Sequence, residues 1–150
     1  MENTPLILLA AGGTGGHLFP AEALGVELIR RGLRVRLATD ARALRYSGLF
    51  TSENIDVVPS ETVRGRSLMA LARTVYTLGY GTLVAVRLVR RLKPAAVVGF
   101  GGYPALPALL AATSAKIPTV IHEQNSVLGR VNRFLASRVM TSSTLITPSS

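Results

Sequence analysis

Short runs of continuous apolar residues recur along the chain and predict buried β-strands. The run LILLA at the amino terminus contains no polar position. A strand that is covered on both faces has this character, since neither face needs polar side chains. The expected strands are Leu6–Ala10, Val35–Thr39, Ile55–Val58, Ala95–Phe100 and Thr119–His122.

Amphipathic segments lie between these strands and predict helices. Gly32 closes the first, and the longest begins at Ser67, a capping residue, and stops before Pro94. Gly79 and Gly81 lie in the middle of this long segment, where we expect a break or a kink. The expected helices are Pro20–Arg31, Ala41–Leu49, Ser67–Leu92, Leu106–Ser114 and Leu128–Ala136.

This alternation of strands and helices predicts an α/β domain with a doubly wound, mostly parallel sheet. The chain has 150 residues, enough for one such domain with a real core. Ligands of these sheets bind beyond the carboxyl ends of the strands. Functional residues are therefore expected in the segments that follow the predicted strands.

Charge and composition narrow the classes of partner. The net charge is +9, and no acidic residue occurs between Thr62 and His122, a span that holds many arginines. This balance favours anionic partners such as nucleic acid, anionic lipid or a diphosphate. The chain has no cysteine, which excludes disulfides and thiolate metal sites, and no apolar run approaches the roughly 20 residues of a membrane span.

The first candidate loop, Gly12–His17, follows the first strand. Its four glycines allow a tight turn and a close approach to a ligand, and amides at the start of a helix favour an anion. Leu18 stands where a dinucleotide fingerprint needs its third glycine, and no Gly-Lys-Ser/Thr follows. The alternative is a strand-to-helix turn that binds nothing.

His17 lies at the mouth of the expected crevice. The positive end of the following helix disfavours the protonated imidazole, which leaves a neutral ring that accepts a proton. A hydrogen-bonded structural histidine is the alternative.

Two further loops follow strands. Gly99–Pro104 combines glycines with Tyr103, and a second glycine loop beside the first would form a paired cradle for a diphosphate. The segment His122–Ser126 places five polar side chains at a strand end, among them Glu123. A plain turn is the alternative for the second loop, and helix capping by Asn125 or Ser126 for the third.

The long helical segment carries a broad apolar surface beside arginines. One interpretation is a helix that faces the core, with solvated arginines. The other is an exposed apolar patch rimmed by cations, typical of peripheral membrane contact. The patch residues are Arg64, Arg66, Leu68, Met69, Leu71, Arg73 and Val75.

Together, the segments GGTGGHLFPAEALGVELIRRG, VVGFGGYPALP and IPTVIHEQNSVLGRVNRFLA resemble the amino-terminal half of the MurG family. These enzymes transfer N-acetylglucosamine from UDP-GlcNAc to lipid I and form lipid II in peptidoglycan synthesis. The resemblance covers about residues 5–136. It implies one half of a GT-B glycosyltransferase fold, in which each half is a Rossmann-like sheet, and inverting transfer without a metal or other cofactor.

The resemblance also implies roles for the loop residues. His17 would be the general base that takes the proton of the acceptor C4 hydroxyl, with Glu123 as orienting group or alternative base. The donor or its diphosphate would contact Thr14, Gly15, Gly16 and Asn125, and the acceptor would contact Gly12, Gly13, Gly101, Gly102 and Tyr103.

The implied partners are UDP-GlcNAc, lipid I and the anionic membrane surface, with no nucleic acid. The implied location is peripheral, on the cytoplasmic face of the bacterial inner membrane. Residues 1–136 would form the acceptor-side domain, and residues 137–150 read as an atypical tail. The family expects a donor domain after it, so we expect the chain to be a fragment that is inactive alone. A non-catalytic domain that binds anionic lipid or nucleotide phosphate is the rival interpretation.

Overall fold

The computed structural model describes residues 4–45, 48–60, 67–123 and 141–142 and forms an α/β sandwich. Its sheet has the order β3-β2-β1-β4-β5-β6, and every neighbouring pair is parallel. The strands are β1 (Leu6–Ala10), β2 (Arg34–Thr39), β3 (Ile55–Val57), β4 (Ala96–Gly99), β5 (Thr119–Ile121) and β6 (Thr141–Ser142).

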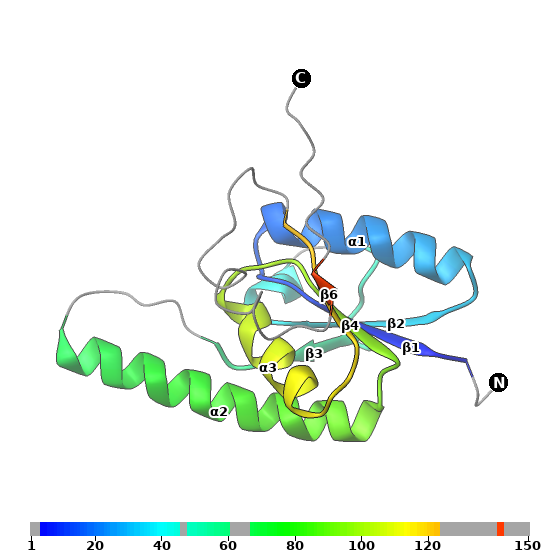
Figure 1. Cartoon of the computed structure of the whole chain (residues 1–150). Coiled ribbons are helices and arrows are strands. Elements are labelled where there is room, and N and C mark those ends of the chain that lie inside the picture. The colour runs from blue at the N-terminus through cyan, green and yellow to red at the C-terminus, as the bar shows by residue number, and fades with distance from the viewer. Residues whose placement is uncertain (1–3, 46–47, 61–66, 124–140, 143–150) are drawn as a thin grey trace.

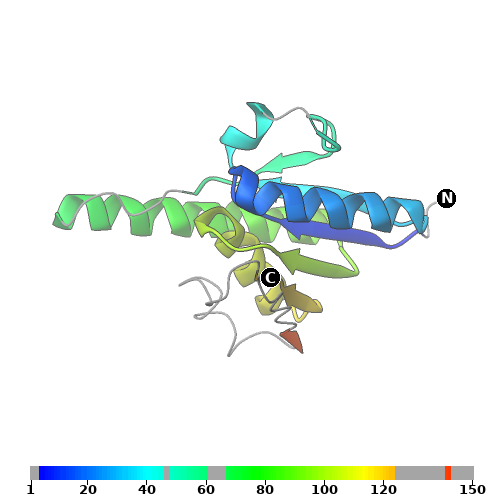
Figure 2. The same ribbon diagram turned by 90° about the horizontal axis from the view of Figure 1, so that it is seen from above.

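Helices cover both faces of this sheet (Figure 1). Helix α1 packs on one face, and α2 and α3 pack side by side on the other (Figures 1 and 2). The helices are α1 (Gly15–Arg30), α2 (Leu68–Leu92) and α3 (Leu106–Ser114), with short 3₁₀ turns η1 (Ala41–Arg45) and η2 (Tyr103–Ala105). The doubly wound parallel sheet predicted from the sequence is therefore confirmed.

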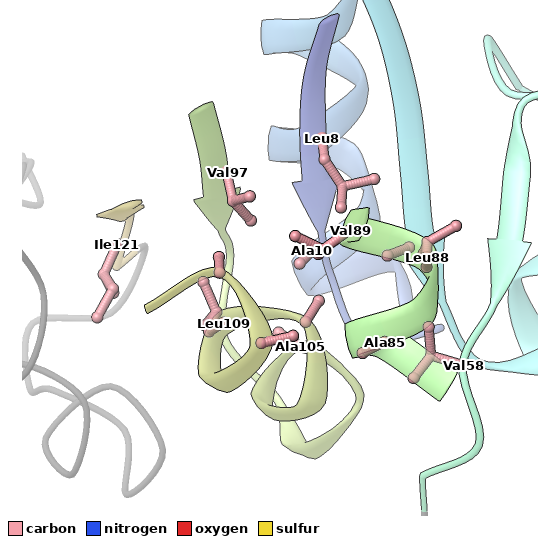
Figure 3. Packing of buried hydrophobic residues seen from close by; sticks show 14 residues of the cluster. Leu8, Ala10, Val58, Ala85, Leu88, Val89, Val97, Ala105, Leu109 and Ile121 are labelled. Atoms are coloured by element: carbon pink, nitrogen blue, oxygen red, sulfur yellow. The ribbon is translucent and has the colours of Figure 1, made fainter. Parts of the chain in front are cut away.

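Two apolar clusters fill the space between sheet and helices. On the face of α2 and α3, Leu8, Val97 and Leu109 are fully buried (Figure 3). On the face of α1, Leu9 and Leu37 meet Phe50. Because β1 contributes alternate side chains to both clusters, its sequence is apolar at every position.

The predicted strands agree with the structure to within one residue at each end. Helix α1 begins earlier than predicted, at Gly15 rather than Pro20, because the Thr14 carbonyl accepts the amides of His17 and Leu18. Gly32 ends the helix with φ of +80°, a conformation that glycine adopts readily.

Helix α2 corrects a second expectation, since it continues without interruption through Gly79 and Gly81. A Cβ atom at Gly81 would overlap the Pro59 carbonyl oxygen, so this glycine permits close packing rather than a break. Ser67 caps the helix as predicted, its hydroxyl accepting the Ala70 amide at 3.1 Å.

The region predicted as the helix Ala41–Leu49 is described as a 3₁₀ turn over Ala41–Arg45. Thr141 and Ser142, predicted as part of an atypical tail, form β6 and extend the sheet beyond β5. The predicted helix Leu128–Ala136 lies outside the described residues.

Candidate active site

The carboxyl ends of β2, β1, β4 and β5 lie next to one another along one edge of the sheet. The chain reverses direction of winding between β1 and β4, which is where ligands bind in open α/β sheets. The two predicted glycine loops follow β1 and β4, so the structure brings them together at this point. The amide of Phe100 donates to the Ala10 carbonyl at 2.8 Å and ties the starts of the two loops.

His17 lies in the first turn of α1 and reaches across to the second glycine loop. Its Nδ1 atom is 2.9 Å from the carbonyl oxygen of Phe100. A carbonyl only accepts, so this contact places the proton of the neutral imidazole on Nδ1 and the ring lone pair on Nε2. In this tautomer Nε2 is the ring nitrogen that carries no proton.

Two glycines surround the imidazole of His17. A Cβ atom at Gly12 would lie 3.0 Å from Cδ2, and one at Gly102 would lie 3.3 Å from both Cδ2 and Nε2. Gly101 and Gly102 have φ values of +84° and +80°, a region that side chains disfavour. The glycines thus allow both loops to approach the ring more closely than other residues would.

The start of α1 presents the backbone of Thr14, Gly15 and Gly16. Thr14 has extended backbone and its side chain makes no capping hydrogen bond. Thr14 and Gly16 are exposed, and the first amides of a helix have no acceptor within it. This arrangement is suited to an anion such as a phosphate.

Tyr103 and Glu123 lie in the other two loops. Tyr103 begins η2 and is partly exposed, packing against the cluster beneath α3. Glu123 follows β5 and is only 3% exposed, whereas His17 is partly exposed. Of the two predicted bases, His17 is therefore the more accessible. Asn125 lies outside the described residues.

Two contributors to this site were absent from the predicted set. One is Asp40, which follows β2 and accepts the Gly13 amide at 3.1 Å. Its position directly after a predicted strand was a usable signal. The other is the carbonyl of Phe100, which no side-chain pattern can reveal because every residue has one.

Asp40 is a buried carboxylate that also pairs with Arg42. Its pKa is lowered: burial alone would raise it, but hydrogen bonds from the Arg42 side chain, the Arg42 amide and the Gly13 amide outweigh that effect. The charged form is thus the one that the fold stabilises.

The amino-terminal half of α2 extends away from the sheet (Figure 1). Leu68 is 85% exposed and Met69 84% exposed, and Leu71 and Val75 are also exposed. We call these four residues the α2 patch; Tyr76 adds an exposed ring that was not predicted. Of the two interpretations of this helix, the exposed apolar surface is the one observed for its first half.

Arg73 is exposed on the same part of α2, while Arg64 and Arg66 lie outside the described residues.

Within the described ranges, no helix has the length and apolar character needed to cross a membrane. The same part of the chain holds no group of three or more histidine and acidic residues placed to hold a metal ion.

Comparison with known proteins agrees with this geometry. The family model described as the glycosyltransferase family 28 N-terminal domain matches residues 7–142. A Rhodopseudomonas palustris (strain CGA009) protein is 74% identical over 139 residues, and a Bradyrhizobium (strain BTAi1) protein is 73% identical over 138. Both are named UDP-N-acetylglucosamine--N-acetylmuramyl-(pentapeptide) pyrophosphoryl-undecaprenol N-acetylglucosamine transferase.

These alignments cover 93% and 92% of this chain but 38% of each relative. The crystal structure of Acinetobacter baumannii MurG superimposes with a TM-score of 0.78 at 32% identity, over 97% of this chain and 44% of that one. The sheet described above is therefore one half of a GT-B glycosyltransferase fold. From the match over residues 7–142, the chain belongs to glycosyltransferase family 28 and carries the N-terminal domain of that family.

Proposed function

We propose that this chain is the acceptor-side half of an inverting N-acetylglucosaminyltransferase. The donor is UDP-N-acetylglucosamine and the acceptor is lipid I, the undecaprenyl-pyrophosphoryl-linked N-acetylmuramyl pentapeptide. The names of relatives that are 74% and 73% identical support these substrates. The observation that carries the chemistry is the contact between His17 and Phe100 at the junction of the two glycine loops.

In this proposal His17 is the general base. The C4 hydroxyl oxygen of N-acetylmuramic acid attacks the anomeric carbon of the donor and forms the new glycosidic bond. The hydroxyl proton passes to Nε2 of His17, and the bond between the anomeric carbon and the diphosphate breaks as UDP leaves. The Phe100 carbonyl, bound to Nδ1 at 2.9 Å, keeps the ring in the tautomer that this step requires.

The two glycine loops bind the phosphates of the substrates. Thr14, Gly15 and Gly16 contact the donor diphosphate through the start of α1, and Asn125 contacts the donor sugar. Gly12, Gly13, Gly101, Gly102 and Tyr103 line the acceptor diphosphate site, and Glu123 orients neighbouring groups. The close approach of Gly12 and Gly102 to His17 supports this assignment, because it brings the backbone of both loops next to the base.

A chimaera tests the base. Residues 1–142 replace the matching segment of the Rhodopseudomonas palustris relative, which supplies the remainder of the transferase. His17→Ala is expected to lower kcat about 10²- to 10⁴-fold, the usual contribution of a general base. Val26→Ala, at an exposed position of the same helix, is the matched control and should retain the rate. An unchanged rate in His17→Ala would remove the base assignment and favour a domain that only binds phosphate.

We further propose that the α2 patch docks on the cytoplasmic face of the bacterial inner membrane, where lipid I is held. Leu68, Met69, Leu71 and Val75 are exposed, and the span from Thr62 to His122 contains basic but no acidic residues. An exposed apolar surface with surrounding cations is typical of peripheral binding to anionic lipid. The arginines of this proposal are Arg64, Arg66 and Arg73.

Sedimentation with vesicles containing phosphatidylglycerol tests the docking. The double variant Leu68→Ser/Met69→Ser should bind less without loss of stability, since both side chains are more than four-fifths exposed. Val26→Ser/Ile29→Ser removes two exposed apolar side chains from α1, on the opposite face of the sheet, and should bind as the wild type does. Equal binding by both double variants would contradict the proposal.

A further inference from the structure

Asp40 accepts four hydrogen bonds directly beyond the end of β2. Oδ2 accepts the Gly13 amide at 3.1 Å and Arg42 Nη2 at 2.7 Å. Oδ1 accepts the Arg42 amide at 2.8 Å and Arg42 Nε at 3.0 Å. The side chain is 10% exposed, so these contacts replace almost all of its hydration.

The first glycine loop rests directly on this carboxylate. A Cβ atom at Gly13 would overlap Oδ1 of Asp40 and lie 3.0 Å from the Cβ of Arg42. The amide of Gly13 points at Oδ2 in the same contact. The position of Gly13 is therefore fixed by Asp40 both sterically and by a charge-assisted hydrogen bond.

The position of Gly13 in turn limits the position of His17. Gly12 precedes it in the chain, and a Cβ atom there would lie 3.0 Å from Cδ2 of His17. Gly102 packs from the other loop, with its Cβ position 3.4 Å from the Gly12 Cα. A shift of the first loop therefore moves the surface against which the imidazole packs.

We propose that Asp40 is a positioning residue for the transfer reaction: it holds the first glycine loop so that His17 Nε2 meets the acceptor hydroxyl. This inference rests on the proposed function, in which His17 is the base. In the proposed reaction, Asp40 does not contact the reacting atoms. It acts through the Gly13 amide, and Arg42 keeps the carboxylate in the required rotamer.

A carboxylate is needed because both oxygens accept at once. Asparagine offers one acceptor oxygen, so it retains either the Gly13 bond or the Arg42 amide bond. Alanine retains neither. We therefore expect kcat to be highest in the wild type, lower in Asp40→Asn and lowest in Asp40→Ala.

The chimaera described above provides the activity test. Misplacement of a catalytic group by about 1 Å can cost about 10²-fold in rate. We expect Asp40→Ala to lower kcat by about 10- to 100-fold, with a smaller change in KM for either substrate, and Asp40→Asn to recover part of this loss.

Asp56 is the matched control. Its carboxylate is also 10% exposed and also pairs with arginines, Arg36 at 2.7 Å and Arg91 at 3.0 Å. It lies on β3 at the edge of the sheet, separated from β1 by β2. Asp56→Ala should lower the melting temperature as Asp40→Ala does, but it should leave kcat of the folded enzyme unchanged.

Nitrogen-15 chemical shifts of the His17 ring in the 150-residue chain provide a readout independent of turnover. Asp40→Asn should change these shifts and Asp56→Asn should not. Unaltered shifts together with an unaltered kcat in Asp40→Asn and Asp40→Ala would overturn the positioning role. The two proposals fail differently: full activity of His17→Ala removes the base, whereas an inactive His17→Ala beside a fully active Asp40→Ala removes only the positioning role.

Discussion

Individual glycines of the first loop differ in what surrounds them. A Cβ atom at Gly13 would overlap Asp40, whereas nothing lies within 4 Å of one at Gly16. We expect Gly13→Ala to lower the free energy of unfolding by about 1–3 kcal/mol, as for other overpacked sites. Gly16→Ala, in the first turn of α1, should leave it unchanged or raise it by up to about 1 kcal/mol. Urea denaturation of the two variants measures the difference, and equal effects would contradict the close contact with Asp40.

The lowered pKa of Asp40 makes stability depend on pH. In the unfolded chain the pKa of this carboxyl has the ordinary value of about 3.9. As pH falls, the unfolded chain therefore binds this proton at a higher pH than the folded protein does. The stabilisation by the charged carboxylate is therefore complete at neutral pH and is lost as pH falls through the lower native pKa. At neutral pH, Asp40→Asn should lower the free energy of unfolding by about 1–3 kcal/mol.

Denaturation of wild type and Asp40→Asn in parallel isolates this carboxylate from the other acidic groups. The difference in free energy of unfolding should shrink at pH values below about 4. A difference that stays constant through that range would mean that Asp40 is not held in its charged form.

Residues of the candidate site could be predicted from the sequence where the residue type and a position directly after a strand indicate them. His17 and the glycines Gly12, Gly13, Gly101 and Gly102 were predicted in this way, and the structure brings the two loops that contain them together. The partner of His17 was not, because the Phe100 contact uses a backbone carbonyl and joins positions 83 residues apart. Asp40 also follows a predicted strand, but a single carboxylate there lacks the glycine pattern that distinguishes the two loops.

Helix α2 is an element in which two glycines have opposite roles. Gly79 is exposed with open space at its Cβ position, and Gly81 is buried against the Pro59 carbonyl. Gly79→Ala should raise the free energy of unfolding by up to about 1 kcal/mol, the difference in helix propensity. Gly81→Ala should lower it, because the helix must move away from the Pro59 segment. Thermal unfolding of both variants tests this, and a gain in Gly81→Ala would show that the contact is loose.

The strands were the elements whose bounds were most predictable, because each continuous apolar run such as Leu6–Ala10 marks a strand that is buried on both faces. The start of α1 was less so, because the glycines before Pro20 have low helix propensity and their helical conformation depends on the Thr14 carbonyl. The kink predicted in α2 is absent because packing on Pro59 outweighs the propensity of Gly81. The two residues of β6 have no distinctive pattern of their own and depend on pairing with β5.

The charge of the molecule as a whole bears on its proposed docking. With a net charge of +9, association with anionic vesicles should weaken as salt screens the surface, while the apolar part of the interaction persists. Sedimentation at rising ionic strength should therefore show partial rather than complete release. Vesicles of neutral lipid give the apolar contribution alone, and tight binding to them at every salt concentration would contradict a role for the arginines.

If the proposed function holds, the amino-terminal half of α2 that extends beyond the sheet affects how the two proposed substrates reach the site. Gly81 packs against Pro59, just beyond the carboxyl end of β3. The part of α2 before Gly81 therefore extends past the carboxyl ends of the strands, on the side of the sheet where the two glycine loops lie. The 13 residues from Leu68 to Tyr80 span about 20 Å at 1.5 Å per residue. With that end seated on a bilayer, a lipid-linked acceptor searches for the site in two dimensions while the nucleotide sugar arrives from solution. The rate would then follow the mole fraction of acceptor in the lipid rather than its amount per volume, because tethering sets its effective concentration.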